Sequence, residues 1–157
     1  MGTTLRPVRD EDHDALFAWQ RDPPAVRMAA FTREDPDDRA AFDAHQHRVR
    51  ADPAVRHRAI ERDGVLVGTV AAFTVEGERE VTSWVDPARW GEGIASEALR
   101  LLLAEELQRP VHGRVAADNV ASRSVLERNG FRVVGQDAGW AAGRRAEVAE
   151  LVLRLDG

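Results

Sequence analysis

Residues 84–99 constrain the fold more strongly than any other segment. They contain a strand-like run, then a loop with two glycines, then a helix-like run. Gly91 and Gly93 allow the backbone to turn tightly and to approach a ligand closely. The first N–H groups of the following helix have no partner within the helix and attract anions. The segment therefore predicts a loop that binds a pyrophosphate. The alternative, in which both glycines only make a tight turn, stays open.

Two other nucleotide-binding loops do not fit this segment. A P-loop requires Gly-Lys-Ser/Thr, and the sequence contains no Lys, since all 22 basic residues are Arg. The dinucleotide fingerprint needs a third small residue, which Ser96 supplies poorly, and it normally opens a larger fold than the residues that follow here. Both interpretations are therefore rejected.

The remaining periodicity predicts an α+β fold with a mixed sheet, formed by residues 1–157 as one domain. Asp63-Gly64 is a hairpin signal, and the second half contains one β-α-β crossover. The expected order is β-α-α-β-β-β-α-β-α-β-β. It comprises strands at residues 3–8, 56–62, 65–75, 78–85, 111–116, 131–135 and 147–155, and helices at residues 10–22, 36–51, 95–108 and 120–129.

The sequence also predicts three local features of the fold. The first helix should end at Asp22-Pro23-Pro24, because proline inside a helix removes a hydrogen bond. Residues 136–145 are expected to form a loop that joins the last two strands. The second helix should pack through the face that carries Ala40, Ala41, Ala44, His47 and Val49.

Composition excludes several classes of protein. The absence of Cys removes disulfide scaffolds, zinc-thiolate sites and cysteine nucleophiles. The formal net charge of −5 disfavours nucleic acid as a partner. The five His residues show no ligand spacing, so no metal is expected. We see no leader and no membrane-spanning run, and therefore expect a cytoplasmic protein without a membrane partner.

Two motifs then resemble one family. The run from Trp90 to Ala95 resembles the acyl-CoA pyrophosphate loop of the GNAT superfamily of N-acyltransferases, Gln/Arg-x-x-Gly-x-Gly/Ala, with Trp90 in place of Gln or Arg. With an aromatic residue at position 90, the run resembles the loop of the branch that acetylates the N-termini of ribosomal proteins. Residues 118–131 are similar to that branch's Asn-x-x-Ser-x-x-Val/Leu-Glu-Lys-x-Gly-Phe. The resemblance is strongest over residues 80–131.

The resemblance implies a donor site for acetyl-CoA. The backbone of three strand residues would pair with the pantetheine arm: Ser83, Trp84 and Val85. The loop and first helical turn would hold the pyrophosphate: Trp90, Gly91, Glu92, Gly93, Ile94, Ala95 and Ser96. The next helix would contact the pantetheine and adenosine through Asn119, Ser122 and Arg123. Asn119 as a helix N-cap and Arg123 as a solvated side chain are alternative roles.

The implied activity is acetyl transfer from acetyl-CoA directly to a primary amine, on a peptide N-terminus or a small molecule. Glu80 is the first candidate base, and Glu147 and Glu61 are weaker ones. A regulatory module that binds CoA without catalysis, and an enzyme that uses a longer acyl-CoA such as succinyl-CoA, are the alternatives.

The general acid and the acceptor are less defined. Many relatives have a Tyr where this chain has Leu126, and the sequence contains no Tyr. Ser122 resembles the serine proposed for this role, and water is the alternative. Residues 10–22, 36–51 and 136–145, with Trp140 in the last segment, are expected to wall the acceptor site. A homodimer is compatible with the resemblance.

Overall fold

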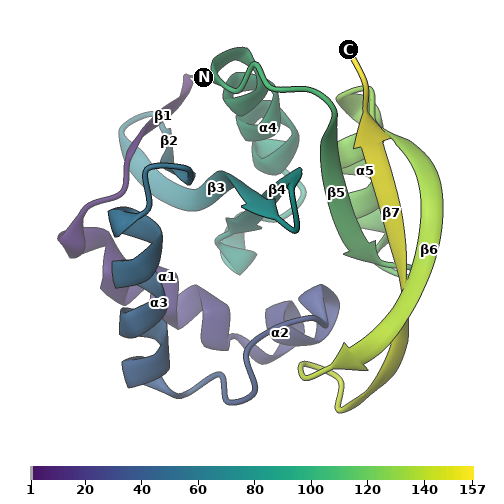
Figure 1. Cartoon of the computed structure of the whole chain (residues 1–157). Coiled ribbons are helices and arrows are strands. Elements are labelled where there is room, and N and C mark those ends of the chain that lie inside the picture. Colours follow the sequence, from purple (N-terminus) through teal and green to yellow (C-terminus); the bar gives the residue numbers. More distant parts are fainter. Residues whose placement is uncertain (1) are drawn as a thin grey trace.

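The computed structural model describes residues 2–157, which form one seven-stranded sheet in the order β1-β2-β3-β4-β5-β7-β6 (Figure 1). Every neighbouring pair is antiparallel except β4 and β5, which run parallel. The expected α+β class with a mixed sheet is confirmed. The strands are β1 Thr3–Pro7, β2 Arg56–Arg62, β3 Val65–Val75, β4 Glu78–Val85, β5 Val111–Ala116, β6 Arg132–Ala141 and β7 Ala146–Leu155.

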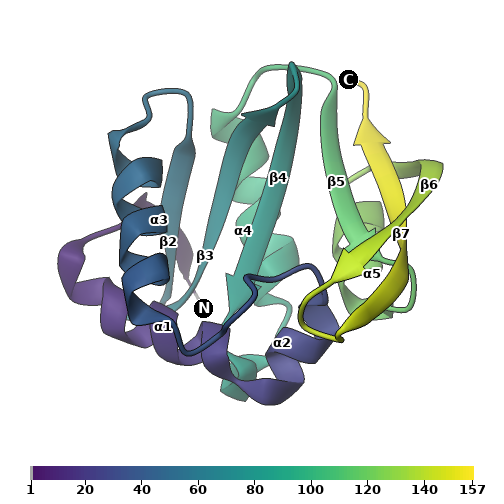
Figure 2. The same cartoon turned by 60° about the horizontal axis from the view of Figure 1, so that its bottom comes forward.

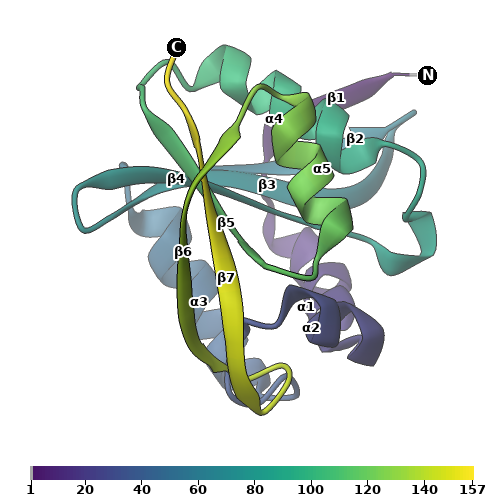
Figure 3. The ribbon, with the colours of Figure 1, turned by 90° about the vertical axis from the view of Figure 1, so that its right-hand side faces the viewer.

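Helices cover both faces of the sheet (Figures 1 and 3). One face carries α1 (His13–Arg21), α2 (Pro23–Ala29) and α3 (Arg39–Ala51), and the other carries α4 (Ile94–Glu105) and α5 (Val120–Arg128). Single 3-10 turns, Asp10–Asp12 and Pro87–Arg89, precede α1 and the glycine loop. The larger core lies under α4 and α5 and is built mainly of aliphatic side chains, among them Ile60, Val67, Val70, Val81, Ile94, Leu99, Leu102 and Leu153.

The β2–β3 hairpin forms where the Asp63-Gly64 signal predicts it. Asp63 and Gly64 have φ angles of 52° and 80°, the left-handed values that a two-residue hairpin turn requires. Arg62 and Val65 are register partners on either side of the turn. The hairpin makes β2 and β3 neighbours in the sheet.

The expected end of the first helix is confirmed, because α1 ends at Arg21, but a new helix begins directly after it. Pro23 occupies the first turn of α2, and the Asp22 side chain accepts a hydrogen bond of 3.0 Å from the Ala25 N–H. Proline is tolerated in a first helical turn, where its missing N–H would have no partner. The sequence analysis therefore missed α2, which becomes part of the site.

Two further expectations are wrong. In α3 the buried residues are Phe42 and Gln46, four residues apart, whereas Ala40, Ala41, Ala44 and His47 are not buried. Most of the expected loop over residues 136–145 is strand, because β6 pairs with β7 as far as Ala141. In both cases contacts with distant segments outweigh the local pattern.

The two parallel strands separate soon after they start. Register partners link β4 to β5 only from Arg79–Val111 to Val81–Gly113, and the rest of each strand diverges (Figure 2). The β6–β7 hairpin reaches back to α2, where the Gly143 N–H donates to the Ala30 carbonyl over 2.8 Å. A Cβ at Gly143 would lie 2.4 Å from the Val26 carbonyl oxygen, so this contact requires glycine.

Within residues 2–157, no helix combines the length and the apolar character needed to cross a membrane. Over the same residues, no group of three His, Cys, Asp or Glu side chains is arranged to hold a metal ion.

Candidate active site

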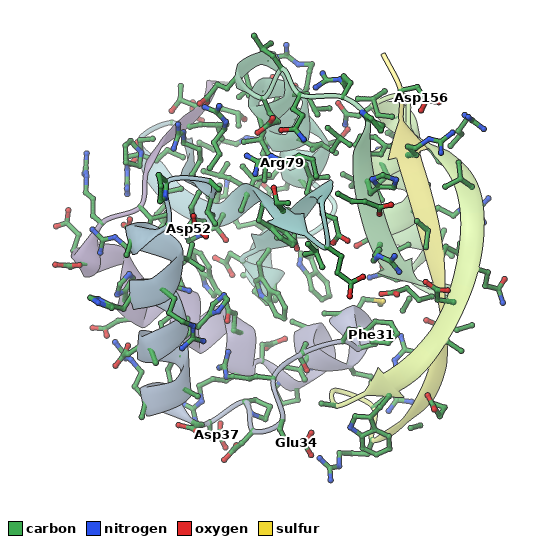
Figure 4. The ribbon with its side chains drawn as sticks, viewed as in Figure 1. Phe31, Glu34, Asp37, Asp52, Arg79 and Asp156 are labelled. Carbon is green, nitrogen blue, oxygen red and sulfur yellow. The ribbon has the colours of Figure 1, made fainter. Side chains whose placement is uncertain are left out.

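A cavity of about 210 Å³ lies where β4 and β5 diverge. Its walls come from both strands, from α4 and α5 on one face, and from the end of α2 on the other. Figure 4 labels Phe31, which follows α2 and borders this space. The lining residues are Ala29, Phe31, Val70, Val81, Thr82, Ser83, Trp84, Ala95, Leu99, Arg114, Val115, Ala116, Asn119, Ser122, Val125 and Leu126. Ser83, Trp84, Ala95, Asn119 and Ser122 of the predicted set are thus brought together.

The β4 edge that faces the cavity has no strand partner beyond Val81. Alternate side chains of a strand point to opposite faces. Val81 packs in the core under α4, whereas Trp84 points to the other face, where its indole N–H donates to the Trp19 carbonyl over 3.2 Å. The free edge is therefore open to an extended ligand, while the side chains on either side of it are fixed.

The glycine loop leads directly into α4. Gly91 and Gly93 have φ angles of 85° and 77°, and Gly93 is the N-cap of the helix. No side chain caps this terminus, and the Glu97 N–H makes the first helical bond, to the Gly93 carbonyl at 3.2 Å. The amides before Glu97 have no partner within the helix, so this terminus suits an anion. Ile94 is buried, which anchors the turn.

Two arginines form hydrogen bonds with this loop and restrain it. Arg89 donates to the Glu92 carboxylate over 2.9 Å, and this bond holds the pKa of Glu92 below its usual range. Arg62, on β2, donates to the Glu92 backbone carbonyl over 3.1 Å. Sequence reasoning missed Arg62, because nothing local to β2 indicates the contact. Trp90 is about half exposed, and its indole N–H donates to the Val85 carbonyl over 3.3 Å.

Asn119 joins three segments at the cavity wall. Its side-chain oxygen accepts from the Ser122 N–H over 3.2 Å, so it is the N-cap of α5. Its amide group donates to the Met28 carbonyl of α2, also over 3.2 Å. Arg123 lies outside the cavity lining and pairs with Glu127 at 3.3 Å. Ser96 contributes its carbonyl to Asn129, over 3.2 Å, and this bond ties α4 to α5.

Glu80 lies beside the cavity on β4 and is 9% exposed. Burial raises the pKa of its carboxyl group, and this effect is partly offset by Arg114. Arg114, on β5, donates from Nε to Glu80 Oε1 over 3.3 Å and also lines the cavity. Sequence reasoning missed Arg114, because its contact with Glu80 depends on the parallel pairing of β4 with β5.

The weaker base candidates lie elsewhere. Glu61 accepts from Arg6 on β1, and Glu147 is exposed on β7; neither lines the cavity. Trp140 lies in β6 rather than in a loop, is 53% exposed and has the Arg145 guanidinium 5.5 Å from its ring centre. None of the three segments expected to wall the acceptor site, residues 10–22, 36–51 and 136–145, contributes to the cavity lining, and the end of the missed helix α2 borders the cavity instead.

The fold is that of the acyl-CoA N-acyltransferases. Residues 3–132, which are most of the chain, match the family model described as "Acetyltransferase (GNAT) domain". The chain therefore belongs to the GNAT acetyltransferase family.

Solved structures of the same fold cover nearly the whole chain. RimJ of Mycobacterium smegmatis, in complex with CoA-disulfide, has a TM-score of 0.83 at 24% identity, over 99% of this chain and 82% of that one. Spermidine N-acetyltransferase of Vibrio cholerae, with CoA and spermine, has a TM-score of 0.79 at 18% identity, over 97% and 95%. Ribosomal-protein-alanine N-acetyltransferase of Brucella melitensis has a TM-score of 0.76 at 21% identity, over 98% and 99%.

One curated relative matches by sequence. The phenylalanine–tRNA ligase beta subunit of Pectobacterium atrosepticum is 33% identical over 99 residues, which are 63% of this chain. The match spans only 11% of the relative's length, so it says nothing about aminoacylation by this chain.

Proposed function

We propose that the chain is one N-acetyltransferase domain that transfers the acetyl group of acetyl-CoA directly to a primary amine. The observation that carries the proposal is the cavity between the diverging ends of β4 and β5, beside the uncapped start of α4. The free β4 edge suits the amides of pantetheine, and the α4 terminus suits the pyrophosphate. The proposed acceptor is a peptide N-terminus or a small-molecule amine, and the proposed location is the cytoplasm.

In the proposed donor site, Ser83, Trp84 and Val85 pair with pantetheine through their backbone. The pyrophosphate lies against the amides that begin α4. Arg62 and Arg89 support the proposal, because they hold Glu92 and with it the loop. The remaining donor contacts are assigned to Trp90, Gly91, Glu92, Gly93, Ile94, Ala95, Ser96, Asn119, Ser122 and Arg123.

The reaction needs a neutral amine. Its nitrogen attacks the thioester carbonyl carbon, a tetrahedral oxyanion forms, and the C–S bond breaks to release CoA thiolate. Glu80 takes the proton of the amine, through water, because its carboxyl group lies beside the cavity and not in its lining. Ser122, which lines the cavity, or water returns a proton to the thiolate. Positioning of the amine against the thioester supplies much of the acceleration.

The first test is calorimetric titration of the purified protein with acetyl-CoA, beside CoA and NAD. We expect micromolar binding of acetyl-CoA and none of NAD. Release of free thiol is then measured with a peptide that begins with alanine and with spermidine, acceptors that the names of the structural relatives suggest. Failure to bind either CoA species would contradict the proposal.

The same assay separates the alternatives. Binding without thiol release for any amine would indicate a regulatory module. Faster release from succinyl-CoA than from acetyl-CoA would indicate a longer donor.

Substitution of the two candidate catalytic residues tests their roles separately. Glu80→Gln should lower kcat by roughly a hundredfold and leave acetyl-CoA affinity nearly unchanged. An unchanged pH–rate profile in this variant would remove Glu80 as the base. Ser122→Ala should lower kcat only if the serine, and not water, protonates the thiolate.

A further inference from the structure

Arg114 lies at the centre of a charged cluster that links four strands. From β5 its Nε donates to Glu80 Oε1 on β4 over 3.3 Å. Its Nη1 donates to Asp137 on β6 over 2.7 Å and to Glu150 on β7 over 3.2 Å. Among residues 2–157, Arg114 is the one charged residue in the cavity lining, whereas the three carboxylate residues are not part of it.

We propose that Arg114 is a positioning residue for the acetyl transfer, which holds the ionised carboxylate of Glu80 beside the cavity on the sheet face that also carries Trp84. This inference rests on the proposed function, in which Glu80 takes the proton of the amine. Glu80 precedes Thr82 of the cavity wall by two residues, about 7 Å along a strand. Arg114 belongs to the cavity lining and binds the Glu80 carboxylate, so it joins this carboxylate to the cavity wall.

The geometry explains why an arginine serves here. A guanidinium carries several N–H donors in a rigid plane, so one group can bind three carboxylates at once. Asp137 and Glu150 share Nη1, and Nε is left for Glu80. The two outer carboxylates therefore fix the orientation of the guanidinium, and the guanidinium fixes Glu80. A lysine ammonium could supply the charge but not these directions.

The charges around Glu80 act in opposite directions. Burial raises the pKa of Glu80, and the negative charge of Glu150 raises it further. Arg114 lowers this pKa, and His112, its register partner on β5, does so to a smaller extent. The β3 register partner, Phe73, is uncharged. Arg114 is therefore the main group that favours the ionised carboxylate, the form that can accept a proton.

The central experiment is an NMR titration of the glutamate side-chain carboxyl carbons, with Glu80→Gln to assign the Glu80 signal. Arg114→Gln should raise the pKa of Glu80, because its nearest cation is lost. Glu150→Gln should lower it, because a nearby anion is lost while the Arg114 contact remains. Arg132→Gln is the matched control, since this arginine pairs with Asp156 at the far end of β6. It should leave the Glu80 signal unchanged.

Kinetics then connect the cluster to the reaction. With the acceptor identified by thiol release, Arg114→Gln should lower kcat roughly tenfold and change KM for acetyl-CoA less than about twofold. The acidic limb of its kcat/KM profile should move to higher pH. Arg114→Lys, which keeps the charge, should restore the position of that limb. A purely structural role would not move the limb at all.

An unchanged Glu80 pKa in Arg114→Gln overturns the inference, and so does a shifted pKa with an unshifted acidic limb. If Arg114→Gln fails to fold, Glu150→Gln still tests the inference, because the pKa of Glu80 should fall in that variant. An unchanged pKa of Glu80 in Glu150→Gln would overturn the inference. Failure of the proposed function is a separate result, because it appears as absence of thiol release with the wild-type protein.

Discussion

The guanidinium of Arg79 lies 2.7 Å from the carboxylate of Glu106, and the two side chains are only 8% and 5% exposed. This pair fastens the start of β4 to the end of α4, and Arg79 also donates to Thr74 (Figure 4 labels Arg79). Burial by itself opposes ionisation of Glu106, yet the hydrogen bonds from Arg79 hold its pKa below the usual range. The pair therefore stabilises the part of the sheet from which β4 and β5 diverge.

Removal of one partner of the Arg79–Glu106 pair should lower the free energy of unfolding substantially. Glu106→Gln leaves the Arg79 charge buried and unpaired, and should lower the free energy of unfolding by roughly 3 kcal/mol. Denaturant unfolding measures the change. Glu105→Gln is the control, because Glu105 pairs with Arg58 at 3.0 Å in a more exposed position. Glu105→Gln should lower the free energy of unfolding by less than about 1 kcal/mol. Equal decreases in the two variants would contradict the view that burial makes the Arg79–Glu106 pair more important.

Gly93→Asp should abolish tight acetyl-CoA binding. A Cβ there meets no atom within 4 Å, so the variant suffers only backbone strain of about 1 kcal/mol and a negative charge at the proposed pyrophosphate site. Gly77→Asp is the matched control, because Gly77 has a φ of 81° and equal space, but lies in the β3–β4 turn. Calorimetry should show at least roughly tenfold weaker binding for Gly93→Asp alone. Equal affinities would refute the loop assignment.

Arg62→Gln should weaken donor binding without altering the fold. Arg62 holds the Glu92 carbonyl, and in a trans peptide the next N–H, that of Gly93, then points the opposite way. Loss of this restraint should reduce acetyl-CoA affinity roughly fivefold, about 1 kcal/mol. Arg58→Gln, on the same strand, should bind like the wild type. A normal affinity in Arg62→Gln would show that the loop keeps its shape unaided.

His57 should make stability depend on pH between about 4 and 6.5. Burial lowers the pKa of His57 from 6.5 to about 4, and nearby His45 and His13 add to this effect. Because the folded-state pKa is depressed, the stabilisation is complete above pH 6.5 and is lost as pH falls towards 4. The loss is on the order of 3 kcal/mol.

Thermal unfolding over this pH range should therefore show a flatter dependence for His57→Asn than for the wild type. His47→Asn provides the comparison, because His47 is exposed on α3. An identical slope in the wild type and His57→Asn would contradict the assignment.

Most features with local causes are predicted correctly from the sequence. Asp63-Gly64 makes its hairpin because those two residues tolerate left-handed backbone, and the glycine loop precedes α4 because glycine can begin a helix with φ of 77°. Asn119 caps α5 because its side chain reaches an amide three residues ahead. Pro23 was misread, although the Asp22-Pro23 pair is itself a helix-start signal.

Features that depend on distant partners were not predicted. Arg114 meets Glu80 across 34 residues, Arg62 meets Glu92 across 30, and Asn119 meets Met28 across 91. The sequence by itself determined the Asp63-Gly64 turn, the Asn119 cap and the glycine loop before α4, because these arise within a few residues of backbone. Only the tertiary structure decided which arginine stands beside Glu80 and which helix closes the cavity, because parallel pairing and its early end at Val81 place these residues together.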